Sequence, residues 1–517
     1  MSNTDLHVQC NVVEVDHQND DIKDDYEYIF LSDGSNTQLD DFLETWREEI
    51  YRKHRILRLN DDCFFKIFSY LPANDLCAIS ETCRDFQRLS RYYVEGHSKR
   101  FHLERASFYN KWSKIRLNDA KRFIRNFGQN LKILSLKNDE FESDANPMRL
   151  LPLLDRYCTQ LQDFVIDVSH LNPMTIIQSE QLNANLQRLS IGAYMIPSDT
   201  NIFGPLNIDA ILTHFTALKH LEVNHLRWTV GEGAYIAKRY EALESLSLQS
   251  FILPPVDTLT AFLSENRQLK RVKFSCCFFN KCTYPLTLPT IPNLESFTLL
   301  SDNNFHVSHD DIGGMQIHQL RLSDITGDIP ALKKLRIDLK NFQKSNLNPL
   351  LDRLAVHNTI EKICIERTHE FPDEMEKHLC ALTSLKILRF TWVKGFTNEI
   401  AKKLACGLPN LPYVEFHYCD VTFSMIEYFL EFSHGVHTIC LFMHVLHKKR
   451  SPFTKAVLLS MINARRRNRH RNVVLTLILN DKVISEAKRN EEGVLKLLLD
   501  CADVIRVLPS RTINILK

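Results

Sequence analysis

Glycine is scarce in this sequence, with 14 among 517 residues, and the short glycine-containing signatures of common enzymes are missing. There is no phosphate-binding GxxxxGKS or GxxxxGKT loop, no dinucleotide-binding GxGxxG and no GxSxG nucleophile elbow, and the zinc motif HExxH is also absent. So few glycines leave little means of building tight anion-binding loops. We therefore expect a protein that is not an enzyme and that needs no cofactor.

Long apolar runs are absent as well, since no stretch of about 18 residues is apolar enough to span a membrane. The N-terminus is acidic rather than basic and then apolar, so it does not resemble a secretory signal. Fourteen cysteines are scattered without the spacing of a small disulfide framework. These features favour a protein of a reducing compartment, cytoplasmic or nuclear.

Charge is nearly balanced over the whole chain, at +1, but it is unevenly distributed. Residues 1–41 carry eleven acidic side chains and one lysine, a net charge of −10, so the rest of the chain carries +11. The acidic segment has few aromatic residues and no sustained periodicity, which is typical of a solvated, disordered tail. A regulatory or partner-binding arm is the alternative for this segment.

Residues 59–93 show the pattern of three short helices. Asp61 or Asp62 can cap the first helix, and its apolar residues recur at i, i+3, i+4 and i+7, which places them on one side. Proline 72 lacks an amide hydrogen and ends this helix. The expected apolar positions of the three helices, in order, are Phe64, Ile67, Phe68 and Leu71, then Leu76, Ile79 and Cys83, then Phe86, Leu89 and Tyr93.

Polar residues between these helices predict where the second and third begin. Asn74 and Asp75 offer side-chain oxygens to start the second helix, and the stretch from Thr82 to Asp85 resembles a capping box for the third. About 35 residues in three helices fall below the size at which one core is usually stable alone. Another part of the chain or another protein must therefore cover the surplus apolar surface.

Several landmarks in this stretch keep a fixed mutual spacing: IFSYLP at residues 67–72, Asp75-Leu76, and CRDF at residues 83–86. With them the segment resembles an F-box, which that family uses to bind a Skp-type adaptor and so join a cullin-based ubiquitin ligase. An ordinary helical subdomain is the alternative. The resemblance implies that the adaptor contacts, or their immediate support, are Leu59, Phe64, Ile67, Phe68, Leu71, Pro72, Leu76 and Ile79.

The rest of the chain is repetitive. Successive first positions of a pattern L-x-x-L-x-L differ by 25 or 26 residues from 218 to 294 and again from 360 to 436. This spacing, with a strand-like triplet in each unit and a helical run between, is the signature of a leucine-rich repeat. The pattern begins at Leu131, Leu161, Leu186, Leu218, Leu243, Leu269, Leu294, Ile317, Leu332, Ile360, Leu385, Leu411 and Val436.

Apolar residues at helical spacing lie between many of these triplets, at 147–158, 208–215, 256–263, 349–356, 372–382, 398–408 and 424–432. The predicted fold class is therefore α/β: an N-terminal three-helix F-box followed by a leucine-rich-repeat horseshoe, with parallel strands concave and helices convex. Ile317 and Leu332 lie too close together for a full unit, so one of these triplets is irregular or lies outside the main sheet. A set of unrelated β-α units is the alternative.

Five segments follow from these patterns. We expect an acidic disordered tail at 1–41, an F-box with a helical lead-in at 42–97 and a helical linker at 98–130. Leucine-rich repeats follow at 131–445. A unit that caps the last repeat, with a last strand near 473–479 and an apolar end at 494–499 and 504–508, completes the chain at 446–517.

Alternate residues of each strand triplet are expected to face the concave side, because successive side chains of a strand point to opposite faces. The resulting surface is mixed, with a basic middle that would attract a partner with an acidic segment. A merely solvated face is the alternative, and Glu366 and Glu415 are among the residues expected on it. The candidate target-binding residues are Arg271, Lys273, Lys334, Arg336, Arg389, Tyr413 and His417.

Four histidines with a cysteine among them suggest a metal site, but their spacing argues against one. A strand at 436–441 would hold His434 and His437 at one end and His444 and His447 at the other, whereas zinc needs ligands converging within about 2.0–2.3 Å. We therefore expect no metal. Cys276, Cys277 and Cys282 lack C-x-x-C spacing and are interpreted as core and loop thiols.

The strongest basic run spans residues 465–471 and contains Arg465, Arg466, Arg467, Arg469, His470 and Arg471. Such a run can act as a nuclear address or a nucleic-acid contact. It follows a helical stretch and precedes a strand, so the alternative is an exposed helix end and turn between repeats.

An F-box followed by leucine-rich repeats resembles the substrate receptors of SCF-type ubiquitin ligases. The resemblance implies that the F-box binds a Skp-type adaptor, and through it a cullin, while the repeats bind a target protein whose lysines are held near a ubiquitin-loaded enzyme. Catalysis is then by proximity, with no catalytic residue in this chain. The alternatives are a leucine-rich-repeat scaffold outside ubiquitin transfer and a nucleic-acid-associated protein that uses residues 465–471.

Overall fold

The computed structural model describes residues 59–97, 116–136, 147–167, 173–180, 182, 185–192, 204–228, 236–249, 252–275, 277–280, 289–300, 317–319, 328–340, 347–442, 455–467, 475–479 and 505–509. The chain divides into two compact units, residues 1–64 and 65–517. The acidic segment 1–41, the helical lead-in before residue 59 and residues 98–115 of the expected linker lie outside the described residues.

Helix α2 (Asp61–Phe68) begins in the first unit. Asn60 caps it, because its side-chain oxygen accepts a hydrogen bond of 2.9 Å from the amide of Cys63. The prediction that Asp61 or Asp62 is the cap was wrong. Both aspartates lie in the first turn, where their charge is favourable near the positive end of the helix dipole.

Helices α3 (Ala73–Ser80) and α4 (Arg84–His97) complete the three expected helices. Phe65 and Phe68 of α2 pack against Tyr93 of α4, with ring centroids 6.1 and 5.8 Å apart. Pro72 occupies the N-cap position of α3. The small core of these helices thus contains the predicted Phe68 and Tyr93, and its contacts include Phe65, which the predicted apolar set omits.

The predicted starts of α3 and α4 were wrong in detail. Asn74 does not cap α3; its amide instead donates a 3.1 Å hydrogen bond to Asp119. Because α4 begins at Arg84, Cys83 rather than Thr82 precedes the helix. Cys83 is exposed, and Cys77 of α3 is buried in its place.

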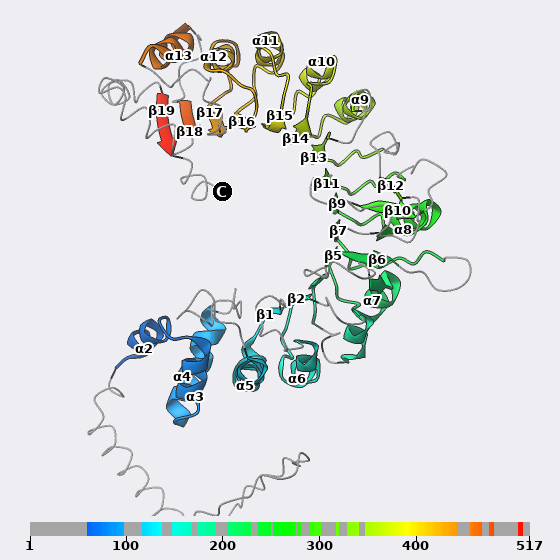
Figure 1. Ribbon diagram of the computed structural model, residues 1–517, viewed down its shortest axis with the longest axis vertical. Helices are drawn as coiled ribbons and strands as arrows, with labels where there is room; N and C mark the ends of the chain where they lie inside the picture. The colour runs from blue at the N-terminus through cyan, green and yellow to red at the C-terminus, as the bar shows by residue number, and fades with distance from the viewer. Residues whose placement is uncertain are drawn as a thin grey trace, which may run out of the picture. The chain divides into compact units, whose positions relative to one another are not determined.

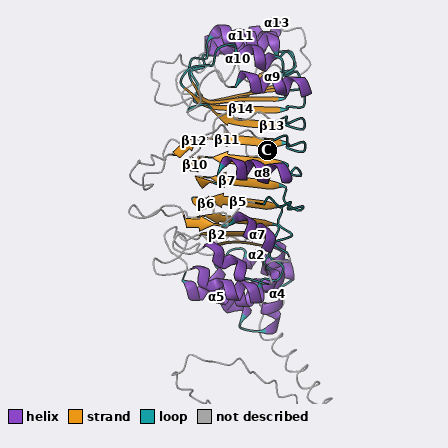
Figure 2. Ribbon diagram, turned by 90° about the vertical axis from the view of Figure 1, so that its right-hand side faces the viewer, coloured by secondary structure: helices purple, strands orange, loops and turns teal. Residues whose placement is uncertain are grey.

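Fourteen strands form one sheet in which every neighbouring pair is parallel and the strands follow chain order (Figures 1 and 2). Twelve of the thirteen predicted triplets supply its first twelve strands, which confirms the α/β repeat. The strands are β1 (Ile133–Leu136), β2 (Asp163–Asp167), β3 (Arg188–Gly192), β5 (His220–Asn224), β7 (Ser245–Gln249), β9 (Arg271–Ser275), β11 (Ser296–Leu300), β13 (Lys334–Asp338), β14 (Lys362–Thr368), β15 (Ile387–Val393), β16 (Tyr413–His417), β17 (Thr438–Phe442), β18 (Leu475–Leu479) and β19 (Ile505–Pro509).

The strand register places equivalent residues of successive repeats side by side. Leu335 pairs with Phe297 on one side and with Ile363 on the other, and all three are buried. Phe390 and Phe416 stack with centroids 5.7 Å apart in the same way. Stacking therefore buries apolar side chains that a single repeat would leave in water.

A second sheet contains five short strands, in the order β12-β10-β8-β6-β4. Its strands are β4 (Gly204–Leu206), β6 (Leu226–Trp228), β8 (Ile252–Leu253), β10 (Phe278–Asn280) and β12 (Ile317–Gln319). Strand β12 is antiparallel to β10, whereas the other pairs are parallel. Ile317 thus begins the one predicted triplet that lies outside the main sheet.

Helices connect many of the strands, and α9 to α13 lie side by side along one face of the main sheet (Figure 1). The expectation of a helix in each unit does not hold for the described part of the connection before β7, residues 236–244, which forms a turn and irregular chain. Among the described residues, no helix is long and apolar enough to cross a membrane. The helical elements after α4 are α5 (Leu117–Phe127), η4 (Gly128–Asn130), η6 (Pro147–Leu150), α6 (Leu151–Tyr157), η7 (Pro173–Gln178), α7 (Ile208–His214), α8 (Val256–Glu265), α9 (Asn348–His357), α10 (Met375–Cys380), α11 (Asn398–Gly407), α12 (Phe423–Phe432) and α13 (Lys455–Arg467).

Candidate interaction surfaces

The residues predicted to contact an adaptor differ sharply in exposure. Leu59 and Ile67 are each 38% exposed. Leu71 and Ile79 are half-buried. The remaining four are buried: Phe64, Phe68, Pro72 and Leu76.

Burial divides this set into residues that a partner can contact and residues that support the helices from within. Phe68 lies under the ring of Tyr93 and is unable to reach a partner without unfolding the helices. Ile67, one residue earlier on α2, projects into solvent. Tyr70, which the predicted set omitted although it lies in the IFSYLP motif, is the most exposed aromatic residue here and has the Lys66 amine 5.3 Å from its ring centroid.

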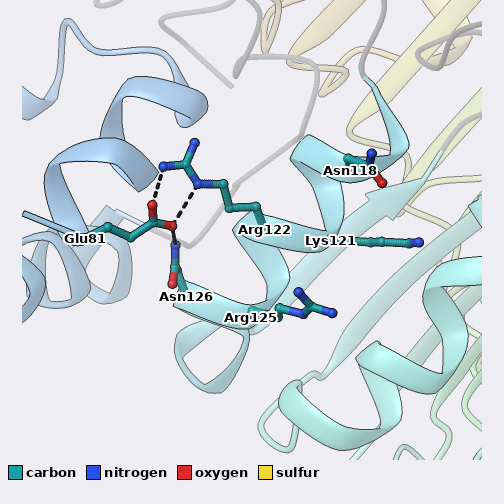
Figure 3. A pocket seen from close by; sticks show the side chains of 6 residues that line it. All are labelled: Glu81, Asn118, Lys121, Arg122, Arg125 and Asn126. Carbon is teal, nitrogen blue, oxygen red and sulfur yellow. Dashed lines mark hydrogen bonds and ion pairs between the residues drawn. The ribbon is translucent and has the colours of Figure 1, made fainter. Parts of the chain in front are cut away.

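Glu81, just after α3, joins the helical segment to the repeats through α5 (Figure 3). Its carboxylate accepts hydrogen bonds from both Nε and the terminal nitrogen of Arg122, and from the Asn126 amide at 2.7 Å. The hydrogen bond from Arg122 is the main reason that the pKa of Glu81 is lowered. An open pocket beside this contact is lined by Glu81, Asn118, Lys121, Arg122, Arg125 and Asn126.

Two arginines of the predicted target surface are held by buried carboxylates. Arg336 donates to Glu366 at 2.7 Å, and Arg389 donates to Glu415 at 2.7 Å. Glu366 is 8% exposed and Glu415 only 1% exposed, so the prediction that both acids face solvent was wrong. The pairs lie on adjacent strands, β13 with β14 and β15 with β16, which explains how residues 30 and 26 positions apart meet.

Glu415 has a second partner in His417, whose Nε2 donates to the other carboxylate oxygen. Burial raises the pKa of Glu415, but the hydrogen bond from His417 and the charge of Arg389 outweigh it, so the pKa is lowered. The ring of His417 stacks on Phe442 at 4.1 Å. The hydroxyl of Tyr413, another predicted target residue, lies 2.9 Å from the Cys440 sulfur.

The other three predicted cations are arranged differently. Arg271 donates a 3.1 Å hydrogen bond to Nδ1 of His220, a neutral acceptor. Lys273 on β9 and Lys334 on β13 are half-buried and exposed, respectively. None of Arg271, Lys273 and Lys334 forms an ion pair with a described carboxylate. The predicted basic middle therefore divides into neutralised and uncompensated cations.

Sequence reasoning missed a pair of exposed aromatic residues at the end of β15 and just after β16. Trp392 and Tyr418 are 44% and 37% exposed, and their rings stack with centroids 4.6 Å apart. Both have left-handed backbone angles, φ 58° and 55°, as does Arg367 with 47° at the equivalent position of β14. Bulky residues rarely adopt this conformation. The signal was present in the sequence, since all three lie four residues after the central apolar residue of their triplet.

Two further candidate motifs are the histidine cluster around residues 434–447 and the cysteine cluster around residues 276–282. Among the described residues, no group of three histidine, cysteine, aspartate or glutamate side chains could hold a metal ion. His437 contacts the Thr438 hydroxyl at 3.0 Å, and Cys277 is buried. Cys440 of the histidine cluster is buried. Four other members of these two clusters lie outside the described residues: Cys276, Cys282, His444 and His447.

The arginine run is partly structural. Arg465 on α13 is only 4% exposed, and burial lowers its pKa. Arg467 binds Glu431 of α12 through two nitrogens, at 3.1 and 2.9 Å. Residues 469–471 lie outside the described residues. Two of the arginines therefore serve helix packing, and the expectation of a wholly exposed helix end was wrong for Arg465.

Comparison with protein families matches residues 56–94 to the F-box domain. This span contains α2 and α3 and most of α4. The search of curated proteins found no match to the chain. The protein thus carries an F-box domain, a module that generally serves as a non-catalytic adaptor, followed by an α/β repeat similar to leucine-rich repeats.

Proposed function

We propose that this protein is the substrate-recognition subunit of an SCF-type ubiquitin ligase. The observation that carries the proposal is an F-box domain at residues 56–94 joined to a long parallel repeat sheet. Residues 42–97 would bind a Skp-type adaptor and through it a cullin. Residues 131–445 would bind the target protein, and residues 446–517 would cap the repeats.

The contribution of this chain is positional. A target held by the repeats has its lysines near the ubiquitin-loaded enzyme, which raises their effective concentration at the reacting thioester. This mechanism requires a firm connection between the adaptor-binding and target-binding parts. The three hydrogen bonds that Glu81 accepts from α5 support such a connection.

For the adaptor contact, we assign Leu59, Ile67, Leu71 and Ile79 to the interface. Their exposed or half-buried side chains can lose further apolar area to a partner, and burying one fully contributes about 1.5–3 kcal/mol. The other four residues of the set, Phe64, Phe68, Pro72 and Leu76, support the helices from within.

Co-purification with a Skp-type adaptor tests the proposal. The full chain should capture the adaptor, and Ile67→Asp should reduce capture at least tenfold because it places a charge in an apolar interface. Tyr92→Asp is the matched control, since Tyr92 is also an exposed large hydrophobic residue on these helices but lies outside the proposed interface. Phe68→Ala is a poor test because it removes a core ring.

Two outcomes would contradict the proposal. If the intact protein captures no adaptor, the ligase function is wrong. If Tyr92→Asp loses as much binding as Ile67→Asp, the assigned interface is wrong. A scaffold outside ubiquitin transfer would capture the adaptor but would not bring a cullin into the complex, so adding cullin to the same experiment separates these two functions.

A further inference from the structure

Strand β11 lies between two strands that carry uncompensated cations. In the register, Ser296 is paired with Arg271 on one side and with Lys334 on the other, and Thr298 is paired with Lys273 and Arg336. Neighbouring strands are about 4.8 Å apart, so the cations of β9 and β13 are separated by about 10 Å. Half-exposed hydroxyl side chains form the floor between them.

Three nearby acids are already engaged in ion pairs with other cations. Glu244 pairs with Lys270 at 3.2 Å, and Glu295 pairs with Lys333 at 3.0 Å. Glu366 binds Arg336, as described above. Arg271, Lys273 and Lys334 therefore form no ion pair with a described carboxylate. Glu295 and Glu361 act on Arg271 and Lys334, respectively, through charge at longer range.

His220 responds to this positive charge. Its pKa is lowered, first by burial and then by the charges of Arg188 and Arg271. The neutral imidazole can accept the hydrogen bond from Arg271, which directs that guanidinium across β7 toward β5, on the side of β9 away from β11. Arg271 thus extends the basic face toward β5, whereas Lys273 and Lys334 flank β11.

We propose that the surface formed by Lys273, Ser296, Thr298 and Lys334, the β11 surface, docks an acidic segment of the target protein. This inference rests on the proposed function and assigns the partner's chemistry. The cations attract aspartate and glutamate side chains, and the Ser296 and Thr298 hydroxyls donate hydrogen bonds to them. Arg336 and Arg389 are bound to buried glutamates and are not part of the β11 surface.

The spread of the charges favours several carboxylates over one phosphate. A single phosphate binds where several donors converge within hydrogen-bond distance, whereas these cations are distributed over a span of about 10 Å. An extended acidic peptide places carboxylates along a comparable length, about 6.8 Å for every second residue. A run of separate acidic side chains therefore matches the β11 surface.

Fluorescence anisotropy on the full chain bound to the Skp-type adaptor tests this inference. The probe is a labelled peptide of alternating glutamate and glycine, compared with its glutamine–glycine analogue and with a glutamine–glycine peptide that carries one phosphoserine. Lys273→Glu and Lys334→Glu should each weaken binding of the glutamate peptide on the order of tenfold. Binding should also weaken as salt is raised, because these charges are exposed.

Lys377→Glu is the matched control, since it makes the same change in net charge at an exposed lysine on helix α10. It should leave binding unchanged. Equal loss in this control, equal binding of the glutamine peptide, or binding of the phosphoserine peptide alone would each overturn the assignment of carboxylates to the β11 surface. Adaptor capture measured on the same variants should be unaffected; its failure in the parent protein would instead contradict the proposed function.

Discussion

Replacing Arg389 with alanine should destabilise strands β15 and β16 far more than the loss of a surface ion pair would. Arg389 contacts Glu415 at 2.6 and 2.7 Å, and Glu415 is 1% exposed. Removing the arginine leaves a buried carboxylate with only His417 beside it. The cost arises from this stranded charge rather than from the lost attraction alone.

The structure sets the size of the effect. A stranded carboxylate can lose its charge by binding a proton, and at pH 7 this costs about 1.36 kcal/mol for each pH unit above an ordinary glutamate pKa of about 4.3, or about 3.7 kcal/mol. Since His417 still donates to Glu415, we expect a loss of about 2–3.5 kcal/mol. Lys386→Ala is the matched control, because its pair with Glu361 is 60% and 42% exposed and is worth at most about 1 kcal/mol.

The pH dependence has a definite sign. The lowered pKa of Glu415 means that its charged form stabilises the parent protein above the ordinary glutamate value, and that this stability is lost as pH falls through the lowered pKa. In the Arg389→Ala variant the pKa of Glu415 should rise instead. The difference between parent and variant is therefore largest at neutral pH and should shrink toward about pH 4.

Native-state hydrogen exchange of the β15 and β16 amides measures this loss locally, which matters because repeats can open separately. Combining Arg389→Met with Glu415→Gln should recover much of the stability, because no charge is then buried. The reasoning fails if Arg389→Ala costs no more than Lys386→Ala at pH 7, or if the difference between variant and parent does not depend on pH.

Three further predictions concern other parts of the fold. Glu81→Gln should loosen the junction by about 1 kcal/mol, since the pair is partly solvent-exposed, and should speed hydrogen exchange in α3 and α5. Trp392→Asn should change the free energy of unfolding little, whereas Trp392→Val should cost at least about 1 kcal/mol more in denaturant titration, because a β-branched residue strains at φ 58°. Gly407→Ala should cost about 1–3 kcal/mol because its methyl carbon would lie 2.1 Å from the Cys380 sulfur, whereas Gly96→Ala, with no atom within 4 Å, should raise the thermal midpoint.

The repeat strands could be predicted because their period is a direct consequence of burial. A residue such as Leu388 must lie beside Ile363 and Val414 for all three to leave water, and this requirement repeats along the chain. Helix α11 was predicted almost to its ends, as residues 398–408, from apolar spacing alone. In the structure the Thr397 hydroxyl caps it by accepting a hydrogen bond from the amide of Ile400.

Prediction failed where a residue had two possible partners. Asn74 has the side chain of a helix cap, but Asp119 on α5 competes for it. Glu366 and Glu415 occupy alternate strand positions that usually face solvent, but an arginine on the adjacent strand covers each of them. The predicted adaptor set was divided for a different reason: Phe68 packs inward, whereas Ile67, the preceding residue, stays exposed.

The sequence alone determined the F-box segment, the repeating α/β architecture and the excess of basic residues near the middle of the repeats, since each depends on local spacing or composition. Only the tertiary structure decided which charges remain available to a partner. Ion pairs such as Arg336 with Glu366 depend on register between strands about one repeat apart. Register is set by packing of the apolar residues beneath, and so the uncompensated cations around β11 could be recognised only in the folded sheet.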